Sequence, residues 1–245
     1  MASSACCDAG PPIVSDYEPK GIISNVNGTD TYLIGSGPQA IVIVYDVFGF
    51  TPQAKQVCDS LAASGFNVAM PDFFKGNPWK LEHFPAPDKA AFLSWVGTSG
   101  DFDTVVRPGV ESTMEFLKGK GAETFGVIGF CWGGAMAMKM AALGGGDSPI
   151  KAAACAHPAF LTEELAAEVK VPMLIMPSKD DPDHLPLKAV LDAKDFGDKC
   201  MYKRFDDMHH GFCAARGDWS VPEQAARATE CVGMFVNFMK KNMES

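Results

Sequence analysis

The chain of 245 residues carries 21 Lys and Arg side chains against 30 Asp and Glu, a formal net charge of −9. Hydrophobic residues make up 47% and charged residues 21%, the proportions of a soluble globular domain, which exclude a low-complexity or collagen-like chain. An acidic chain with no basic run longer than a pair is repelled by phosphate backbones, so we expect no nucleic-acid partner.

No membrane or export signal stands out in the sequence. The longest apolar runs have the length of a strand and fall short of the ~20 residues that a membrane-spanning helix needs. The N-terminus lacks the basic stretch and apolar core of a secretory signal peptide. We therefore expect a cytoplasmic protein without a membrane partner, as a monomer or weak homodimer.

Short apolar runs alternate with longer helical patterns after residues 1–20, which we interpret as a partly flexible leader. We predict strands over 32–34, 40–45, 66–70, 125–130, 152–156, 172–176 and 201–205. We predict helices over 52–64, 104–118, 132–143, 186–194 and 222–241. Thr51 followed by Pro52 suits a helix start, because threonine caps a helix and proline fits its first position.

Several central runs are apolar at every position, as in I-V-I-V at 41–44. Strands of this kind are covered on both faces, as in a parallel sheet flanked by helices. The sequence therefore predicts an α/β fold, one doubly wound, mostly parallel sheet flanked by helices, in a single domain over 21–245. Such sheets bind ligands at the carboxyl ends of their strands, where we look for chemistry.

A candidate nucleophile lies in the motif G-F-C-W-G-G at 129–134, between a predicted strand and a predicted helix. The G-x-C-x-G spacing is that of the nucleophile elbow, with the thiol of Cys131 in place of a hydroxyl. The glycines are needed because side chains two residues to either side would collide, and the following helix N-terminus favours a thiolate. A Gly-rich structural turn with an incidental cysteine is the alternative.

An elbow predicts an acid and then a histidine further along the chain. Asp180 and Asp181 follow one predicted strand, and His209 and His210 follow the last one. We favour Asp180 over Asp181 because it is nearer the strand end. We favour His210 because the glycine after it lets the backbone turn tightly. Cys131, Asp180 and His210 are then nucleophile, orienting acid and general base.

The remaining candidates would stabilise or bind the substrate. An oxyanion hole needs two backbone N–H donors, which we assign to Trp132 and to Val47, with Phe48 as the alternative to Val47. Arg216 is a candidate anchor for a substrate anion or a surface salt bridge, and His157 a substrate contact or a structural histidine. An apolar pocket wall, or else core packing, is the role expected for the aromatic residues Tyr45, Phe48, Phe74, Trp79 and Trp132.

Taken together, these motifs resemble the dienelactone hydrolase family of α/β-hydrolases. The likeness runs from about residue 20 to the C-terminus, with Y-D-V-F-G-F at 45–50, P-D-F-F at 71–74 and H-G-F at 210–212 besides the elbow. The resemblance implies the α/β-hydrolase fold and hydrolysis of small lactones or activated esters by a Cys-Asp-His triad, with no metal or cofactor. It also supports Asp180 and His210 over their neighbours. The leader is similar to that of plant and fungal members.

Asp46 departs from this resemblance, because bacterial members carry a glutamate at that place. The family implies that this carboxylate holds the resting thiol protonated and takes its proton when substrate arrives. Aspartate is one methylene shorter, so this activation is in doubt here, and holding its own loop is the alternative role for Asp46.

We thus predict a hydrolase of small lactones or activated carboxylic esters that forms an acyl-thiol intermediate. The first alternative is a non-catalytic small-molecule receptor on the same fold. The second is a thiol redox protein or a metal site, which would use Cys6, Cys7, His209, His210 and Cys213. Eight scattered cysteines without a C-x-x-C pair weaken it, and we interpret most of them as small buried hydrophobes.

Overall fold

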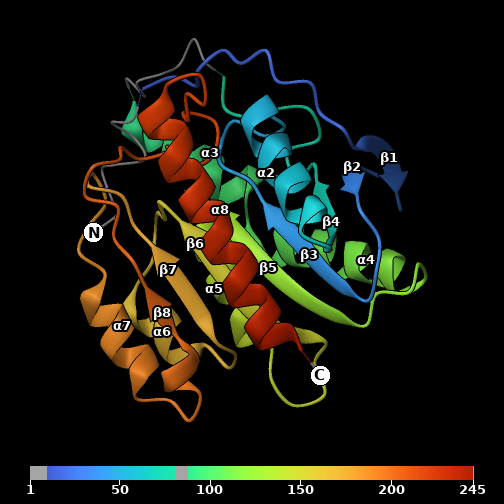
Figure 1. The fold of residues 1–245 in the computed structure, drawn as a ribbon, viewed down its shortest axis with the longest axis vertical. Helices are drawn as coiled ribbons and strands as arrows, with labels where there is room; N and C mark the ends of the chain where they lie inside the picture. Colours follow the sequence, from blue (N-terminus) through green and yellow to red (C-terminus); the bar gives the residue numbers. More distant parts are fainter. Residues whose placement is uncertain (1–9, 81–87, 245) are drawn as a thin grey trace.

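The fold is known from a computed structural model, which describes residues 10–80 and 88–244. Within these residues lies an eight-stranded sheet in the order β1-β2-β4-β3-β5-β6-β7-β8 (Figure 1). Neighbouring strands from β4 to β8 pair in parallel, whereas β2 is antiparallel to both β1 and β4. The strands are β1 (Ile22–Val26), β2 (Thr29–Ile34), β3 (Gln39–Val44), β4 (Asn67–Pro71), β5 (Thr124–Phe130), β6 (Ile150–Ala156), β7 (Met173–Met176) and β8 (Met201–Tyr202).

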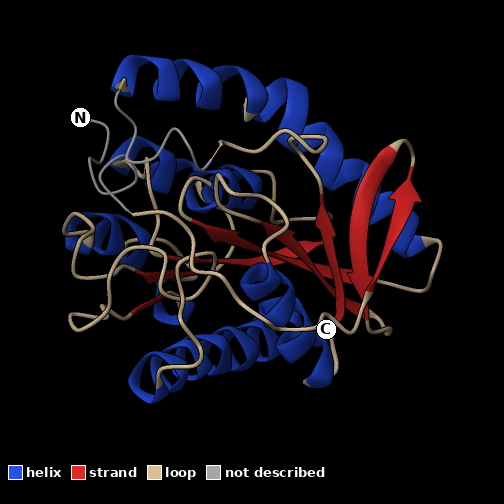
Figure 2. Ribbon diagram, turned by 90° about the horizontal axis from the view of Figure 1, so that it is seen from above, coloured by secondary structure: helices blue, strands red, loops and turns tan. Residues whose placement is uncertain are grey.

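Helices cover both faces of this sheet (Figure 2). On one face α8 packs across β5, β6 and β7 and also contacts α2, and on the other α5 packs on β5 and β6 with α6 beside it. The helices are α2 (Pro52–Ala63), α3 (Lys89–Ser99), the wide-turn π-helix η2 (Phe102–Val106), α4 (Arg107–Lys118), α5 (Gly133–Ala142), α6 (Glu163–Glu168), α7 (Leu185–Asp192), the 3-10 turn η3 (Gly197–Lys199) and α8 (Pro222–Met243). The prediction of a doubly wound, mostly parallel α/β sheet is confirmed.

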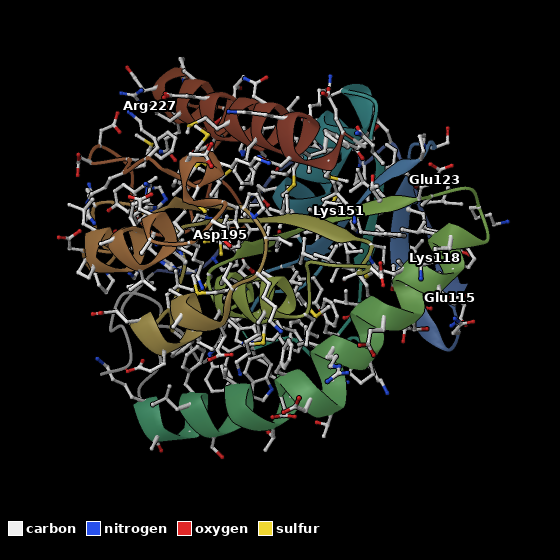
Figure 3. The ribbon with its side chains drawn as sticks, turned by 90° about the horizontal axis from the view of Figure 1, so that it is seen from below. Glu115, Lys118, Glu123, Lys151, Asp195 and Arg227 are labelled. Carbon is white, nitrogen blue, oxygen red and sulfur yellow. The ribbon has the colours of Figure 1, made fainter. Side chains whose placement is uncertain are left out.

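The core lies where the sequence is apolar at every position. All seven residues of β5 are buried, and so are five of the six in β3, because helices cover both faces of these strands. Charged side chains lie on the outer surfaces of the helices, as for Glu115 and Lys118 of α4 and Arg227 of α8 (Figure 3). Thr51 caps α2 as predicted, with its hydroxyl accepting a hydrogen bond from the backbone N–H of Ala54.

Among the strands and α-helices, three elements were not predicted. β1 forms a hairpin with β2 through Asn27 and Gly28, both at positive φ, which is the turn that Asn-Gly favours. α3 and α6 were missed because α3 spreads its apolar residues around the helix and α6 is only six residues long. The helix predicted over 104–118 begins instead at Arg107, after η2. Among the described helices, none has the length and apolar composition required to cross a bilayer.

Candidate active site

Cys131 lies in a sharp turn between the end of β5 and the start of α5. Its φ of +53° is unusual for a residue other than glycine and marks a strained position. A Cβ atom on Gly129 would lie 1.9 Å from the carbonyl oxygen of Gly133, and one on Gly133 would lie 2.2 Å from that of Val44. Both glycines are therefore required by the turn. The predicted elbow geometry is confirmed at 129–134.

His210 lies opposite this turn, in the loop 205–217 that follows β8. The loop is held against the end of β7 because the N–H of Lys179 donates to the carbonyl of Met208 at 2.9 Å. Gly211, directly after the histidine, has a φ of +91°, so the tight backbone turn expected from H-G-F is present. His210 is almost fully buried, at 2% exposure.

Asp181, and not Asp180, is the carboxylate that pairs with the His210 ring. Nδ1 of His210 and Oδ1 of Asp181 are 2.5 Å apart, and both side chains are almost wholly buried. Asp180 is exposed, and its Oδ2 accepts a hydrogen bond from the backbone N–H of His210 at 2.9 Å. The assignment of the orienting acid to Asp180 was therefore wrong.

The turn after β7 explains this correction. The N–H of Ser178 donates to Oδ2 of Asp181 at 2.7 Å, and the N–H of Asp181 donates back to the carbonyl of Ser178 at 3.3 Å. This reversal folds residue 181 back over the strand end and turns residue 180 outward. Distance along the chain was thus a poor guide to distance from the strand end.

The electrostatics of the three groups favour a charged arrangement. Burial disfavours the imidazolium of His210, but negative charge on Cys131 together with the hydrogen bond and the charge of Asp181 outweighs burial and raises the pKa of the ring to about 10. Burial acts to raise the pKa of Asp181, yet the hydrogen bond from His210 and the attraction of its charge hold that pKa below its ordinary value. The charged forms of His210 and Asp181 therefore stabilise each other, and negative charge on Cys131 favours the same state of the ring.

Two arginines brace the loops of this site. Arg204 was not singled out from the sequence, where it was only half of a basic pair. Its guanidinium donates to the carbonyls of Lys179, Asp181 and Pro182 at 3.0, 2.9 and 3.1 Å. Five donors in a rigid fork suit three converging carbonyls, so Arg204 fixes the turn that carries Asp181.

Arg216, the second of these arginines, is half-buried in the histidine loop. Its Nη1 donates to the carbonyl oxygen of His210, and its backbone N–H donates to the carbonyl of Gly211 at 3.2 Å. Its cation also lies within electrostatic range of Asp180, Cys131 and Asp46, each of which acts to raise its pKa against burial. Arg216 therefore supports the loop and places positive charge beside the thiol.

Asp46, at the end of β3, is buried and joins two loops. Its Oδ1 accepts from the N–H of Phe48 at 2.9 Å, and its Oδ2 accepts from the N–H of Ala215 at 3.2 Å. Burial raises its pKa to about 6, although both N–H donors and the charges of His210 and Arg216 act against this. The alternative role for Asp46, holding its own loop, is the one that these contacts match.

The same contacts bear on the oxyanion hole. Because the N–H of Phe48 donates to Asp46, it is already engaged within the protein, and Val47 stays the predicted donor from this loop. Trp132 is the N-cap residue of α5, directly after Cys131, where helix N–H groups have no partner within the helix. Its side chain is 1% exposed and packs on Phe73 and Phe74, which makes it a core residue.

His157, after β6, was expected either to touch substrate or to be a hydrogen-bonded structural histidine. Its side chain is fully buried, and its ring packs edge-on against His210 with centroids 5.2 Å apart. Neither ring nitrogen has a hydrogen-bond partner, and burial holds the pKa of the ring well below its ordinary value. His157 therefore packs against His210, and the hydrogen bond expected of a structural histidine is absent from its ring.

Two of the aromatic residues that were expected either to line a pocket or to pack in the core lie in the core. Tyr45 and Phe74 are buried, and their ring centroids lie 5.2 Å apart, which matches core packing.

The candidate metal site is not formed by the residues that the structure describes. In residues 10–80 and 88–244, no group of three or more His, Cys, Asp or Glu side chains is arranged to hold a metal ion. Cys6 and Cys7 lie outside the described residues.

Comparisons with known proteins identify the family and the fold of this chain. The model of the dienelactone hydrolase family matches residues 30–243. An uncharacterised AIM2 family protein of Schizosaccharomyces pombe is 31% identical over 217 residues, which cover 85% of each chain. A carboxymethylenebutenolidase homologue of Xenopus tropicalis is 34% identical over 143 residues, 55% of each chain.

Solved structures share the fold at low sequence identity. The dienelactone hydrolase-like promiscuous phosphotriesterase P91, from metagenomic libraries, matches with a TM-score of 0.63 at 19% identity over 91% of this chain and 97% of its own. The dienelactone hydrolase of Anabaena variabilis matches with a TM-score of 0.58 at 13% identity, over 91% and 99%. The chain belongs to the dienelactone hydrolase family and has its α/β-hydrolase fold.

Proposed function

We propose that this protein hydrolyses small lactones or activated carboxylic esters through a thioester formed on Cys131. The observation that supports this most is the meeting of three groups from separate segments: Cys131 at the elbow, His210 in its loop and Asp181 paired with the His210 ring at 2.5 Å. The carboxymethylenebutenolidase homologues among its relatives carry names of the same reaction class.

In the first half of the reaction, the Cys131 thiolate attacks the carbonyl carbon while His210 carries the proton. The N–H groups of Trp132 and Val47 donate hydrogen bonds to the carbonyl oxygen and stabilise the negative charge that develops on it. When the tetrahedral intermediate collapses, the carbon–oxygen ester bond breaks and the leaving alkoxide takes the proton from His210. In a lactone, this alcohol stays attached to the acyl group.

In the second half, water attacks the thioester while His210 accepts a proton from it. The carbon–sulfur bond breaks, the carboxylic acid leaves and the thiolate of Cys131 is restored beside the imidazolium of His210. Asp181 holds the ring with Nε2 toward the sulfur and stabilises the imidazolium throughout. These steps use only side chains of this chain, two backbone N–H groups and water.

The test is turnover of aryl acetates and dienelactones by the purified protein, compared with Cys131→Ala and Cys131→Ser, with chelator present. We expect wild-type turnover that falls at least a thousandfold in Cys131→Ala, because removal of the nucleophile leaves only binding and oxyanion stabilisation. Labelling of Cys131 by a thiol-reactive ester, with reduced labelling in His210→Ala, would support the same mechanism. Equal turnover in all variants would overturn it, and lactone binding without turnover would favour a receptor.

A further inference from the structure

The N-terminal segment 10–21 precedes β1 and lies against the loops of the active site. The backbone N–H of Ile13 donates to the carbonyl oxygen of Ala215 at 3.0 Å. In return, the carbonyl of Ile13 accepts from Nε2 of Gln53, on α2, at 2.7 Å. One residue of the segment 10–21 therefore bridges the histidine loop and α2, the first helix after the oxyanion loop.

The backbone N–H of Ala215 contacts Asp46. Its N–H donates to Oδ2 of this buried carboxylate, whose Oδ1 holds the N–H of Phe48. A continuous hydrogen-bonded chain thus runs from Gln53 through Ile13, Ala215 and Asp46 to the loop of the candidate oxyanion donor Val47. It links the two loops that must keep their spacing for the reaction.

Arg216, the next residue, connects this chain to the histidine. Its guanidinium donates to the carbonyl of His210, and the leader backbone passes close to the same guanidinium. A side-chain atom on Gly10 would lie 3.3 Å from Nη2 of Arg216. The segment 10–21 therefore limits the space open to Arg216, the residue that donates to the carbonyl of His210.

The other end of the segment is anchored independently of the site. The hydroxyl of Tyr17 and the N–H of Lys20 both donate to Oδ2 of Asp59, at 2.7 and 2.8 Å. Asp59 is buried on α2, and its Oδ1 accepts from the hydroxyl of Tyr32 at 2.6 Å. Because α2 holds the segment at both Gln53 and Asp59, Ile13 has a fixed position from which to hold Ala215.

We propose that the segment 10–21 is a positioning element of the active site, in which the backbone N–H of Ile13 holds the histidine loop in register with the oxyanion loop. The effect of this positioning on turnover rests on the proposed function. The loop 205–217 has little regular secondary structure of its own beyond short turns, so its place depends on a small number of such bonds. Loss of one leaves His210 present but less well placed.

The test replaces single residues in the full-length chain. Ile13→Pro removes the N–H donor and puts a ring in its place, whereas Val14→Pro is the matched control at a side chain that is 98% exposed. We expect Ile13→Pro to lower kcat by about three- to tenfold, the effect of one net hydrogen bond, with KM changed less than about twofold. Val14→Pro should leave both constants within about twofold.

A second readout separates positioning from general support of the fold. Ile13→Pro removes the bond to the carbonyl of Ala215, and the N–H of the same residue acts to lower the pKa of Asp46. A shift of residue 215 should therefore let the Asp46 bridge between the two loops protonate at higher pH, and the acid limb of the kcat profile should move to higher pH in Ile13→Pro alone. His210 and Arg216 are the charged groups that also act on Asp46, and both are retained in this variant. The rate at which iodoacetamide alkylates Cys131 across pH gives the same information without turnover.

The outcomes are distinguishable from failure of the proposed function. If the wild type has no esterase activity, the alkylation profile still tests the leader, and a change confined to Ile13→Pro supports it. Equal profiles and rates in Ile13→Pro and wild type, or equal losses in both proline variants, would overturn the proposal. Should Ile13→Pro fail to fold, Gln53→Met, which frees the carbonyl of Ile13, takes its place with an expected loss of about two- to threefold.

Discussion

Oδ1 of Asp181 lies 2.5 Å from Nδ1 of His210, with the two side chains 0% and 3% exposed. A buried carboxylate at this distance keeps the proton of the ring on Nδ1 and so fixes its tautomer. Nε2 is then the ring nitrogen that can face Cys131. The neighbouring Asp180 contacts only the backbone of the same histidine. The two adjacent acids therefore have different roles: Asp181 holds the ring of His210, and Asp180 holds the backbone of its loop.

This difference predicts unequal effects of two matched substitutions. Asp181→Asn should lower kcat by roughly 10³- to 10⁴-fold, because an amide at this place favours the wrong tautomer and does not stabilise the imidazolium. Asp180→Asn keeps an oxygen for the backbone N–H of His210 and should lower kcat by less than about tenfold. Steady-state kinetics on one activated ester give the comparison. A larger loss in Asp180→Asn would return the role to that residue.

Arg204 carries a second prediction, because its guanidinium is the brace of the Asp181 turn. Arg204→Met keeps much of the side-chain length but loses the donors to three carbonyls, and we expect kcat to fall by about tenfold. Arg204→Lys should recover little of this, since a single ammonium does not replace a planar fork. A wild-type kcat in Arg204→Lys would mean that residue 204 needs only a positive charge and not the guanidinium.

His157 leads to a prediction about stability. Its two ring nitrogens are buried without partners, and each such group costs about 1–3 kcal/mol. His157→Phe keeps a ring of similar shape and removes both, so we expect Tm to rise by about 2–4 °C with KM unchanged. The measurement is a thermal melt alongside kinetics.

His157→Asn serves as the control for the backbone at this position. Asparagine tolerates the φ of +37° better than phenylalanine but leaves space beside His210, so Tm should fall. A large rise in KM for His157→Phe would show that the ring reaches substrate after all.

How far the sequence predicted this site depends on which rule was applied. The elbow was predictable because glycine two residues before and after Cys131 is a steric requirement, and the structure places backbone carbonyls where their side chains would be. The tight turn after His210 followed from Gly211 in the same way. These are local rules, and they need no knowledge of the rest of the chain.

What the sequence missed depends on contacts between distant segments. Asp181 replaces Asp180 because of a turn closed by Ser178, and the role of Arg204 depends on where three carbonyls converge. The two oxygens of Asp46 are held by residues 48 and 215, so its role was invisible until both loops were in place. Periodicity and spacing carry no information of this kind.

Asp46 gives the last prediction, which concerns pH. Its pKa is about 6 in the folded chain against 3.8 ordinarily, so its proton binds more tightly in the folded state. The stability that this proton supplies is fully present below the lower value and is lost as the pH rises through about 6. Between about pH 4 and pH 7.5, the free energy of unfolding of the wild type should therefore fall relative to Asp46→Asn by on the order of 2 kcal/mol.

Urea unfolding at a series of pH values gives this difference directly, because other titrating groups are common to both proteins. Asp195→Asn removes an exposed surface carboxylate and is the control for the loss of one carboxylate from the chain (Figure 3). A flat difference for Asp46→Asn as well would mean that the pKa of Asp46 is the same in the folded and the unfolded chain, with the hydrogen bonds from Phe48 and Ala215 offsetting the effect of burial.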